Sequence, residues 1–217
     1  MNKSSKKFDS EINNIEHYRK YPAMKPFVGK NYGKGTNRKI MLVAESHYLP
    51  PTSVISNSSE IWYNSNQEDL SNEEVRWINT RGILQGNWKP AGHMIFRELN
   101  SRMSEFMDTT EFRAMTNVAF MNGFQRPSPE TGDSIKHFCR KIDYEIGAKT
   151  INSVIKILKP DLVIFVSKLS WDKLRWKIPK QKNEVKYEFV CHPGTGGRYW
   201  HNKNYEHGLK KFKRIIT

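Results

Sequence analysis

Residues 39–45 read KIMLVAE, and residues 161–167 read DLVIFVS. In both stretches the apolar residues follow one another instead of alternating with polar ones, which is typical of strands buried on both faces of a parallel sheet. Two further apolar runs, MTNVAFM at residues 115–121 and EVKYEFVC at residues 184–191, also predict strands. The sequence therefore predicts four short strands at the centre of the fold.

Helical patterns separate these strands. Residues 91–107 and 134–158 carry apolar side chains at every third or fourth position, the spacing of an amphipathic helix. A short helix after Ser170 and a last helix over residues 204–216 complete the alternation. We therefore expect an α/β fold, a three-layer α/β/α sandwich with a mainly parallel four-stranded central sheet.

The domain organisation follows from the breaks in these patterns. Residues 1–38 contain two prolines and three glycines after a short helix-like stretch, so we expect a basic N-terminal arm there. Residues 39–217 would form a single α/β domain. Within it, residues 50–90 contain no clear strand, and we expect an irregular insertion over the strand ends.

The charge of the chain is uneven. The net charge of the 217 residues is +14, with +6 in residues 1–38, −2 in residues 39–155 and +10 in residues 156–217. Cationic ends suit a polyanion such as nucleic acid, because lysine and arginine displace counterions from phosphates; the alternative is a solubilising surface. We expect nucleic acid as the partner and a monomer as the oligomeric state.

Other features exclude several classes of protein. The chain has no run of about 18 apolar residues and no apolar segment near Met1, so we expect neither a membrane span nor a secretory signal, and a cytoplasmic location. Cys139 and Cys191 are too few for a four-cysteine iron–sulfur cluster. The spacing of Cys191 with the histidines His47, His201 and His207 matches no zinc pattern. We expect no metal and no cofactor.

Polar side chains follow three of the four predicted strands. The first strand leads into Glu45-Ser46-His47-Tyr48, the second into the segment from Asn122 to Arg126, and the fourth into His192-Pro193 and a glycine-rich loop. Ligands of open α/β sheets bind beyond the carboxyl ends of the strands. We expect an acid, a histidine and an asparagine to meet at this edge.

These motifs resemble those of the uracil-DNA glycosylase superfamily. AESHY at residues 44–48 is similar to its first motif, in which a small residue precedes Gln or Glu. TNVA at residues 116–119, followed by Arg126-Pro127, resembles a strand T-N-V-V followed by R-P-P. The run LKPDLVIFV resembles the next family strand, and His192-Pro193 falls where the family has H-P-S. Four such motifs in order are more specific than any one of them.

The resemblance implies that a base is flipped out of DNA and its N-glycosidic bond hydrolysed. It implies Glu45 and His192 as catalytic residues: the acid positions water or stabilises the sugar cation, and the histidine bonds the departing base. It implies that Asn117 reads the base edge, with Asn122 as a substitute, and that Ser46 and Tyr48 line the base pocket. The Tyr48 position is one where a branch of the family excludes the thymine methyl group. The DNA contacts would be Arg126, Gly194, Gly196, Gly197, Arg198, Tyr199 and Trp200, the loop residues filling the space left by the flipped base.

The chain also departs from the family. Ser46 stands where one branch has a carboxylate, His47 replaces the proline of the first motif, and Gly194 replaces the serine of the last. Each candidate has a structural alternative: Glu45 as a helix cap, His192 as a strand-ending hydrogen bond, and the aromatic residues after Gly197 as core. Two other functions therefore stay open, a non-catalytic nucleic-acid-binding protein that retains the fold, and an enzyme acting on a free nucleotide or nucleoside.

Overall fold

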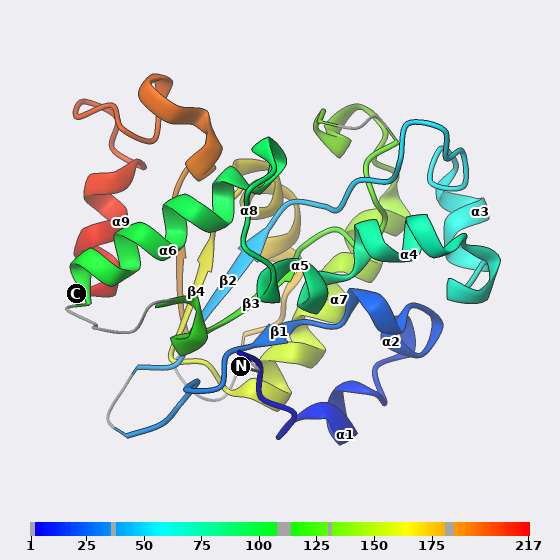
Figure 1. The fold of residues 1–217 in the computed structure, drawn as a ribbon, viewed down its shortest axis with the longest axis horizontal. Helices are drawn as coiled ribbons and strands as arrows, with labels where there is room; N and C mark the ends of the chain where they lie inside the picture. The colour runs from blue at the N-terminus through cyan, green and yellow to red at the C-terminus, as the bar shows by residue number, and fades with distance from the viewer. Residues whose placement is uncertain (1–2, 36–37, 108–113, 130–131, 181–184) are drawn as a thin grey trace.

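A computed structural model describes residues 3–35, 38–107, 114–129, 132–180 and 185–217. Its centre is a sheet of five strands, in the order β1-β3-β2-β4-β5 (Figure 1). The strands are β1 (Phe27–Val28), β2 (Ile40–Ala44), β3 (Val118–Asn122), β4 (Leu162–Phe165) and β5 (Lys186–Phe189). Strands β2 to β5 pair in parallel, and β1 runs antiparallel to β3. The α/β class is confirmed, but the sheet is mixed and five-stranded instead of four-stranded.

Helices pack on both faces of the sheet (Figure 1). Side chains of β2 alternate between two hydrophobic clusters, because successive residues of a strand point to opposite faces. Ile40 and Leu42 face the cluster that includes α6 (Met94–Phe106) and α9 (Leu209–Ile216). Met41 and Val43 face the cluster that includes α7 (Lys141–Leu158) and the end of α8 (Lys168–Leu174). Burial on both faces explains why β2 and β4 are continuously apolar.

The remaining helices are short. They are α1 (Asp9–Ile12), α2 (Glu16–Lys20), α3 (Ser59–Asn64), α4 (Asn72–Ile78) and α5 (Thr80–Gln85). Seven 3-10 segments join them among the described residues: η1 (Pro22–Met24), η2 (Gln67–Asp69), η3 (Ala91–His93), η4 (Ala114–Asn117), η5 (Ile135–His137), η6 (Arg175–Lys177) and η7 (Pro193–Arg198). The predicted insertion at residues 50–90 thus contains three α-helices.

Three element boundaries differ from the sequence expectation. The predicted strand at residues 115–121 begins only at Val118, because residues 114–117 form a 3-10 turn. The predicted helix at residues 134–158 is divided into η5, capped by Ser134, and α7, which starts at Lys141. The last helix starts at Leu209, directly after Gly208. Local caps and turns, which the apolar spacing does not record, decide all three.

The N-terminal segment packs against the rest of the chain. Phe27 and Val28 pair with Phe120 and Ala119 of β3. Tyr21 is fully buried and stacks on Trp62 of α3, with ring centroids 4.2 Å apart and planes 7° from parallel. Residues 3–35 therefore contribute a strand and several core side chains to the same body as the sheet.

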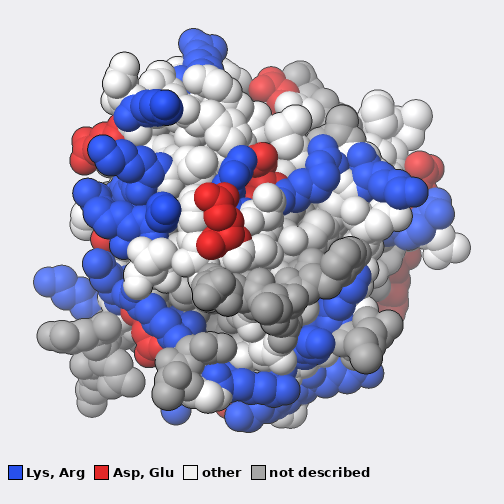
Figure 2. Space-filling view, turned by 60° about the vertical axis from the view of Figure 1, so that its left-hand side comes forward, with Lys and Arg blue, Asp and Glu red and all other residues white. Residues whose placement is uncertain are grey.

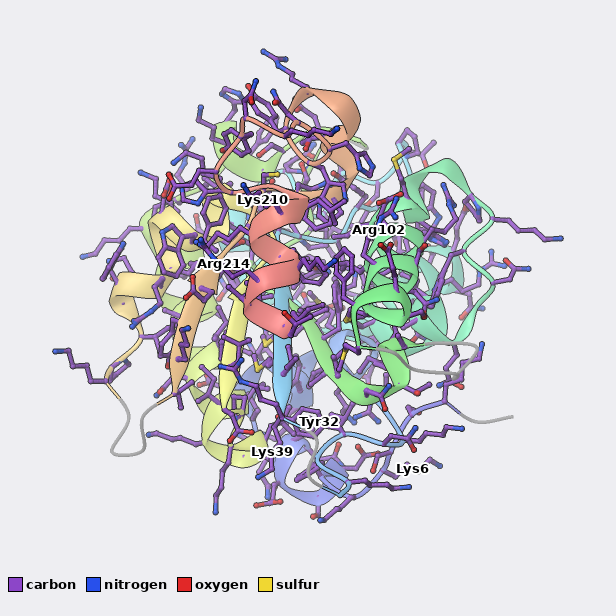
Figure 3. The ribbon with its side chains drawn as sticks, turned by 90° about the vertical axis from the view of Figure 1, so that its left-hand side faces the viewer. Lys6, Tyr32, Lys39, Arg102, Lys210 and Arg214 are labelled. Carbon is purple, nitrogen blue, oxygen red and sulfur yellow. The ribbon has the colours of Figure 1, made fainter. Side chains whose placement is uncertain are left out.

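Basic side chains spread over the surface near α9. Figure 2 shows blue lysines and arginines across this face with few red acidic groups, and Figure 3 shows Lys210 and Arg214 on α9. Lys211, by contrast, forms an ion pair with Glu188 at 3.2 Å. None of the described helices combines the length and apolar character needed to cross a bilayer.

Candidate functional site

The parallel register brings the ends of β2, β3 and β4 to one edge of the sheet. Ala44 lies opposite Asn122, and Val43 lies opposite Phe165. The residues that follow these strands, including Glu45 and Ser167, therefore meet at the carboxyl edge, where open α/β sheets bind their ligands.

The half-buried Glu45 carboxylate is held by two serine hydroxyls. Ser134 Oγ donates to Oε1 at 2.6 Å, and Ser167 Oγ donates to Oε2 at 2.9 Å. Each carboxylate oxygen accepts one hydrogen bond in this way and keeps capacity for another. The side chain is thus fixed in orientation while a second partner can still bind it.

The same two serines cap helical segments. Ser134 Oγ accepts the backbone N–H of Lys136 at the start of η5, and Ser167 Oγ accepts that of Ser170 at the start of α8. A hydroxyl accepts one hydrogen bond from the backbone while its own proton goes to Glu45. Ser134 and Ser167 were not predicted as site residues, although a serine before a helix is a recognisable capping signal in sequence.

His192 follows β5 and presents one free ring nitrogen. Its Nδ1 accepts the backbone N–H of Gly194 at 3.0 Å, so the proton of the neutral ring is on Nε2. Among the described residues, Nε2 has no hydrogen-bond partner. Burial lowers the pKa of His192, and the charge of nearby Glu45 partly opposes that effect. A neutral imidazole that donates from Nε2 therefore lies within electrostatic range of a carboxylate.

Tyr48, Ser46 and Asn122 lie at the same edge. Burial, followed by the charges of Glu45 and Asp133, raises the pKa of Tyr48, so its hydroxyl stays protonated beside the acid. Ser46 follows Glu45 directly, and the half-buried Asn122 ends β3. Within the described ranges, the side-chain amide of Asn122 makes no hydrogen bond, which leaves both its donor and its acceptor available.

Asn117 is not at this edge. It belongs to η4, before β3, whereas the carboxyl edge begins after Asn122. Four strand steps from Val118 to Asn122 cover roughly 13 Å at about 3.3 Å per residue. Asn117, which the resemblance implies as the residue that reads the base edge, is therefore placed away from Glu45, and the substitute candidate Asn122 is the asparagine that the register places there.

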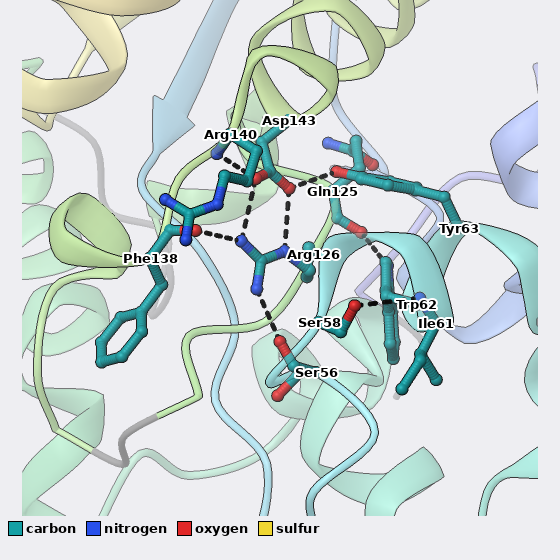
Figure 4. A network of polar contacts seen from close by, with 10 residues as sticks. All are labelled: Ser56, Ser58, Ile61, Trp62, Tyr63, Gln125, Arg126, Phe138, Arg140 and Asp143. Carbon is teal, nitrogen blue, oxygen red and sulfur yellow. Dashed lines mark hydrogen bonds and ion pairs between the residues drawn. The ribbon is translucent and has the colours of Figure 1, made fainter.

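Arg126 is buried and cannot contact DNA from its position. Its guanidinium donates to both carboxylate oxygens of Asp143, at 2.9 and 2.8 Å (Figure 4). It also donates to the backbone oxygens of Ser56 and Phe138. Neither Arg126 nor Asp143 is exposed to solvent. The prediction of a DNA-contacting arginine is wrong, because this side chain joins the 50–58 loop to the start of α7.

The glycine-rich loop divides into an exposed and a buried part. Gly194, Gly197, Arg198 and Tyr199 are exposed, and Gly196 has a positive φ of 52° that glycine adopts without strain. Trp200 is fully buried, packs on Phe212 and donates from Nε1 to Glu98 at 3.0 Å. Trp200 is therefore a core residue, and its prediction as a DNA contact is wrong; Tyr199 is the exposed aromatic residue of this loop.

The histidines and cysteines considered for a metal site have other surroundings. His47 is buried and its Nε2 lies 3.0 Å from Thr80 Oγ1, while Cys191 is a buried free thiol. In the part of the chain that the structure describes, no three His, Cys, Asp or Glu side chains form a group that could hold a metal ion.

Comparison with known proteins does not assign the chain to a family. No model of a protein family matches its sequence, and no curated protein is similar to it. The functional interpretation therefore depends on the chemistry of the carboxyl edge.

Proposed function

We propose that the Glu45–His192 edge hydrolyses the N-glycosidic bond of uracil or a related deaminated base in DNA. The observation that supports it most is a clamped carboxylate within electrostatic range of a neutral histidine whose Nε2 has no partner among the described residues. Cleavage of an N-glycosidic bond generates positive charge on the sugar and negative charge on the base. An adjacent anion and an adjacent hydrogen-bond donor stabilise these two charges.

In the proposed reaction, His192 and Glu45 each have one role. The bond between the sugar C1′ and the base nitrogen breaks, and its electron pair leaves with the base. His192 Nε2 donates to the carbonyl oxygen of the departing base, while the Glu45 carboxylate stabilises the cationic sugar. Water then adds to C1′, and the proton that it loses neutralises the base anion, giving an abasic sugar and a free base. A duplex base reaches this edge only when flipped out of the stack.

Recognition of the base falls to residues beside this pair. The side-chain amide of Asn122, which has no hydrogen-bond partner among the described residues, can donate and accept on one side, which suits the adjacent carbonyl and N–H of uracil. Tyr48 and Ser46 lie next to the acid and would line the pocket. Exposed Arg198 and Tyr199 supply a cation and an aromatic ring for the DNA next to the flipped base.

The test is release of a base from labelled oligonucleotides that contain uracil, hypoxanthine, xanthine or a G·T mismatch, detected as strand cleavage after alkali. We expect His192→Ala and Glu45→Gln to reduce product by at least roughly a hundredfold, the scale of losing one charge-stabilising group. Exposed His201, changed to Ala, is the matched control. Full activity in both site variants would remove Glu45 and His192 from the mechanism.

One observation favours the second candidate, a non-catalytic nucleic-acid-binding protein. Asn117, which the resemblance implies as the residue that reads the base edge, lies in η4, away from the Glu45–His192 edge. This candidate predicts salt-sensitive DNA binding without any abasic product. Base release from any of the four substrates would exclude it.

A further inference from the structure

Trp176 is the most exposed of the large hydrophobic side chains among the described residues. Its exposed fraction is 72%, compared with at most 5% for Trp62, Trp88 and Trp200. Most tryptophans in folded proteins are largely buried, so a tryptophan held outward is informative. It belongs to η6, which follows α8 and contacts β5 through Arg175 and Tyr187.

The fold holds Trp176 outward. Leu174 and Ile178, on either side of it, are buried in the core, so the short 3-10 turn between them is anchored at both ends. The edge of the Trp176 ring contacts Trp171, with centroids 5.8 Å apart, and Trp171 in turn packs on Phe165. One face of an anchored indole is therefore presented to solvent at little further cost in side-chain entropy.

Basic residues flank Trp176 in the sequence, and one of them, Arg175, lies beside its ring. The guanidinium of Arg175 stacks over Tyr187 at 3.6 Å from the ring centroid and lies 5.5 Å from the Trp176 ring. Lys173, Lys177 and Lys180 are exposed, and within the described residues none of them has an ion-pair partner. Among the described acids close to this segment, Asp172 pairs with Lys168, and Glu188 pairs with Lys186 and Lys211.

We propose that Trp176, with Arg175, Lys173, Lys177 and Lys180, forms a binding surface for single-stranded DNA, separate from the Glu45–His192 edge. An unpaired base would stack on the Trp176 indole, and the cations would contact the adjoining phosphates. Aromatic rings that stack bases inside a positive surface are the usual means of binding single strands without sequence preference. The choice of DNA over RNA rests on the proposed function, whereas the stacking surface itself does not.

The surface can act together with the carboxyl edge. Ser167, which bonds Glu45, and Trp176 are the two ends of one continuous segment, α8 and η6. Nine residues at about 1.5 Å each place them roughly 14 Å apart along that segment. At the spacing of about 3.4 Å per nucleotide found in duplex DNA, this corresponds to about four nucleotides. A strand bound at Trp176 would thereby raise the local concentration of nearby bases at the edge.

An anionic membrane is the other partner that tryptophan and lysine suit. Binding to a membrane surface requires a contiguous apolar face, and η6 exposes one large apolar side chain between charged ones. The stacked Arg175–Tyr187 pair and the isolated ring favour a strand of nucleic acid.

The experiment measures binding of the full chain to a labelled oligothymidylate of about 20 nucleotides, longer than the ~4–16 nucleotides covered by known single-strand sites. Because this probe contains no uracil, the result is independent of base excision. We expect Trp176→Ala to weaken binding roughly tenfold and Trp176→Phe to restore much of it. Ile61→Ala, which truncates another exposed apolar residue, is the control and should leave affinity unchanged.

A second pair of variants tests the cations. Each phosphate contact of a single strand contributes roughly 0.7 to the steepness of log affinity against log salt concentration. The double variant Lys173→Gln with Lys177→Gln removes two contacts, so this steepness should fall by about 1.4. Lys141→Gln with Lys149→Gln removes the same charge from α7 and should change the slope much less. Circular dichroism confirms that every variant is folded.

Any of three results would refute the proposed binding surface. The wild-type chain could fail to bind oligothymidylate, or Trp176→Ala could bind it as tightly as wild type does. The third result is binding that depends on Trp176 but occurs with anionic vesicles and not with DNA. If the wild-type chain excises a base and Trp176→Ala binds oligothymidylate with unchanged affinity, only the proposed binding surface is refuted. Trp176-dependent binding without excision would refute the proposed function alone.

Discussion

Arg126 and Asp143 form a bidentate ion pair in which neither side chain has any exposed surface. Asp143 also accepts hydrogen bonds from Tyr63 Oη and from the backbone N–H of Arg140 (Figure 4). Four segments of the chain therefore meet at one carboxylate: α3, the loop after β3, the residue before α7 and α7 itself.

Breaking this ion pair should destabilise the protein strongly. Arg126→Met leaves the Asp143 charge buried without its main partner, and we expect a loss of about 3–5 kcal/mol in the free energy of unfolding, measured in urea. Lys149→Met, which removes the partner of Glu16 in an exposed pair, is the control, with an expected loss below about 1 kcal/mol. Equal losses in the two variants would contradict a buried pair.

Truncation of the neighbouring residues Trp200 and Tyr199 should reduce the stability of the fold to very different extents. Trp200→Ala removes a buried ring and its bond to Glu98, so we expect a loss of about 3–5 kcal/mol in unfolding free energy. Tyr199→Ala removes a partly exposed ring and should cost less than about 1 kcal/mol, while weakening DNA binding. Thermal and urea unfolding measure the stability of both variants. An unchanged free energy of unfolding in Trp200→Ala would contradict the burial of this ring in the core.

Acid should destabilise the fold through buried histidines. Burial, with smaller contributions from the Lys20 and His47 charges, lowers the pKa of His17 to about 3, and burial lowers that of His47 to about 4. The unfolded chain binds these protons below its ordinary pKa of about 6.5, and the folded chain does not, so stability falls as pH decreases. Between pH 7 and pH 5 we expect a loss of about 2 kcal/mol for each histidine.

The variant His17→Phe isolates one of these contributions. It keeps an aromatic ring among Tyr18, Tyr21 and Tyr63, and it removes a buried Nε2 that has no partner among the described residues. The drop in unfolding free energy between pH 7 and pH 5 should shrink by about 2 kcal/mol. Exposed His137, changed to Gln, is the control, and a drop of unchanged size in His17→Phe would refute the assignment.

The serines that hold Glu45 should matter for catalysis through the orientation of that carboxylate. If the proposed function holds, Ser134→Ala and Ser167→Ala should each lower kcat about tenfold, on the scale of one hydrogen bond to a charged group, with little change in KM. Ser167→Thr keeps the hydroxyl and should restore most of the rate. Ser153→Ala, which removes a serine bonded to a backbone oxygen on α7, is the control. A rise in KM with kcat unchanged would argue against an orienting role.

The strands of the sheet could be predicted because burial on both faces leaves a continuous apolar run. Strand β1 could not, since two residues, Phe27 and Val28, carry no periodicity, and only their pairing with β3 makes them a strand. The start of β3 was predicted three residues early because Met115 lies just before the apolar run, and the turn at residues 114–117 leads directly into the strand. Asn117, implied by the resemblance as a base-reading residue, therefore belongs to this turn and not to the strand.

The candidate site was predictable only in part. Glu45, His192 and Asn122 follow strands, so the topology of parallel sheets places them together. Arg126 is buried because it pairs with Asp143, which lies 17 residues further along the chain. Trp200 is buried where it can bond Glu98, which is 102 residues away in sequence. An arginine or tryptophan after a strand has the same local signature whether it faces solvent or the core.

The short β1 strand also has a consequence for how copies of this chain meet. A sheet edge with free backbone groups can pair with the edge of another molecule, and a very short outer strand or charged side chains prevent this. Here β1 covers the outer side of β3 with only two residues, and β5 at the opposite edge carries Lys186 and Glu188. Neither margin offers a long apolar strand as a template, so the fold opposes growth of its sheet into a fibrous aggregate.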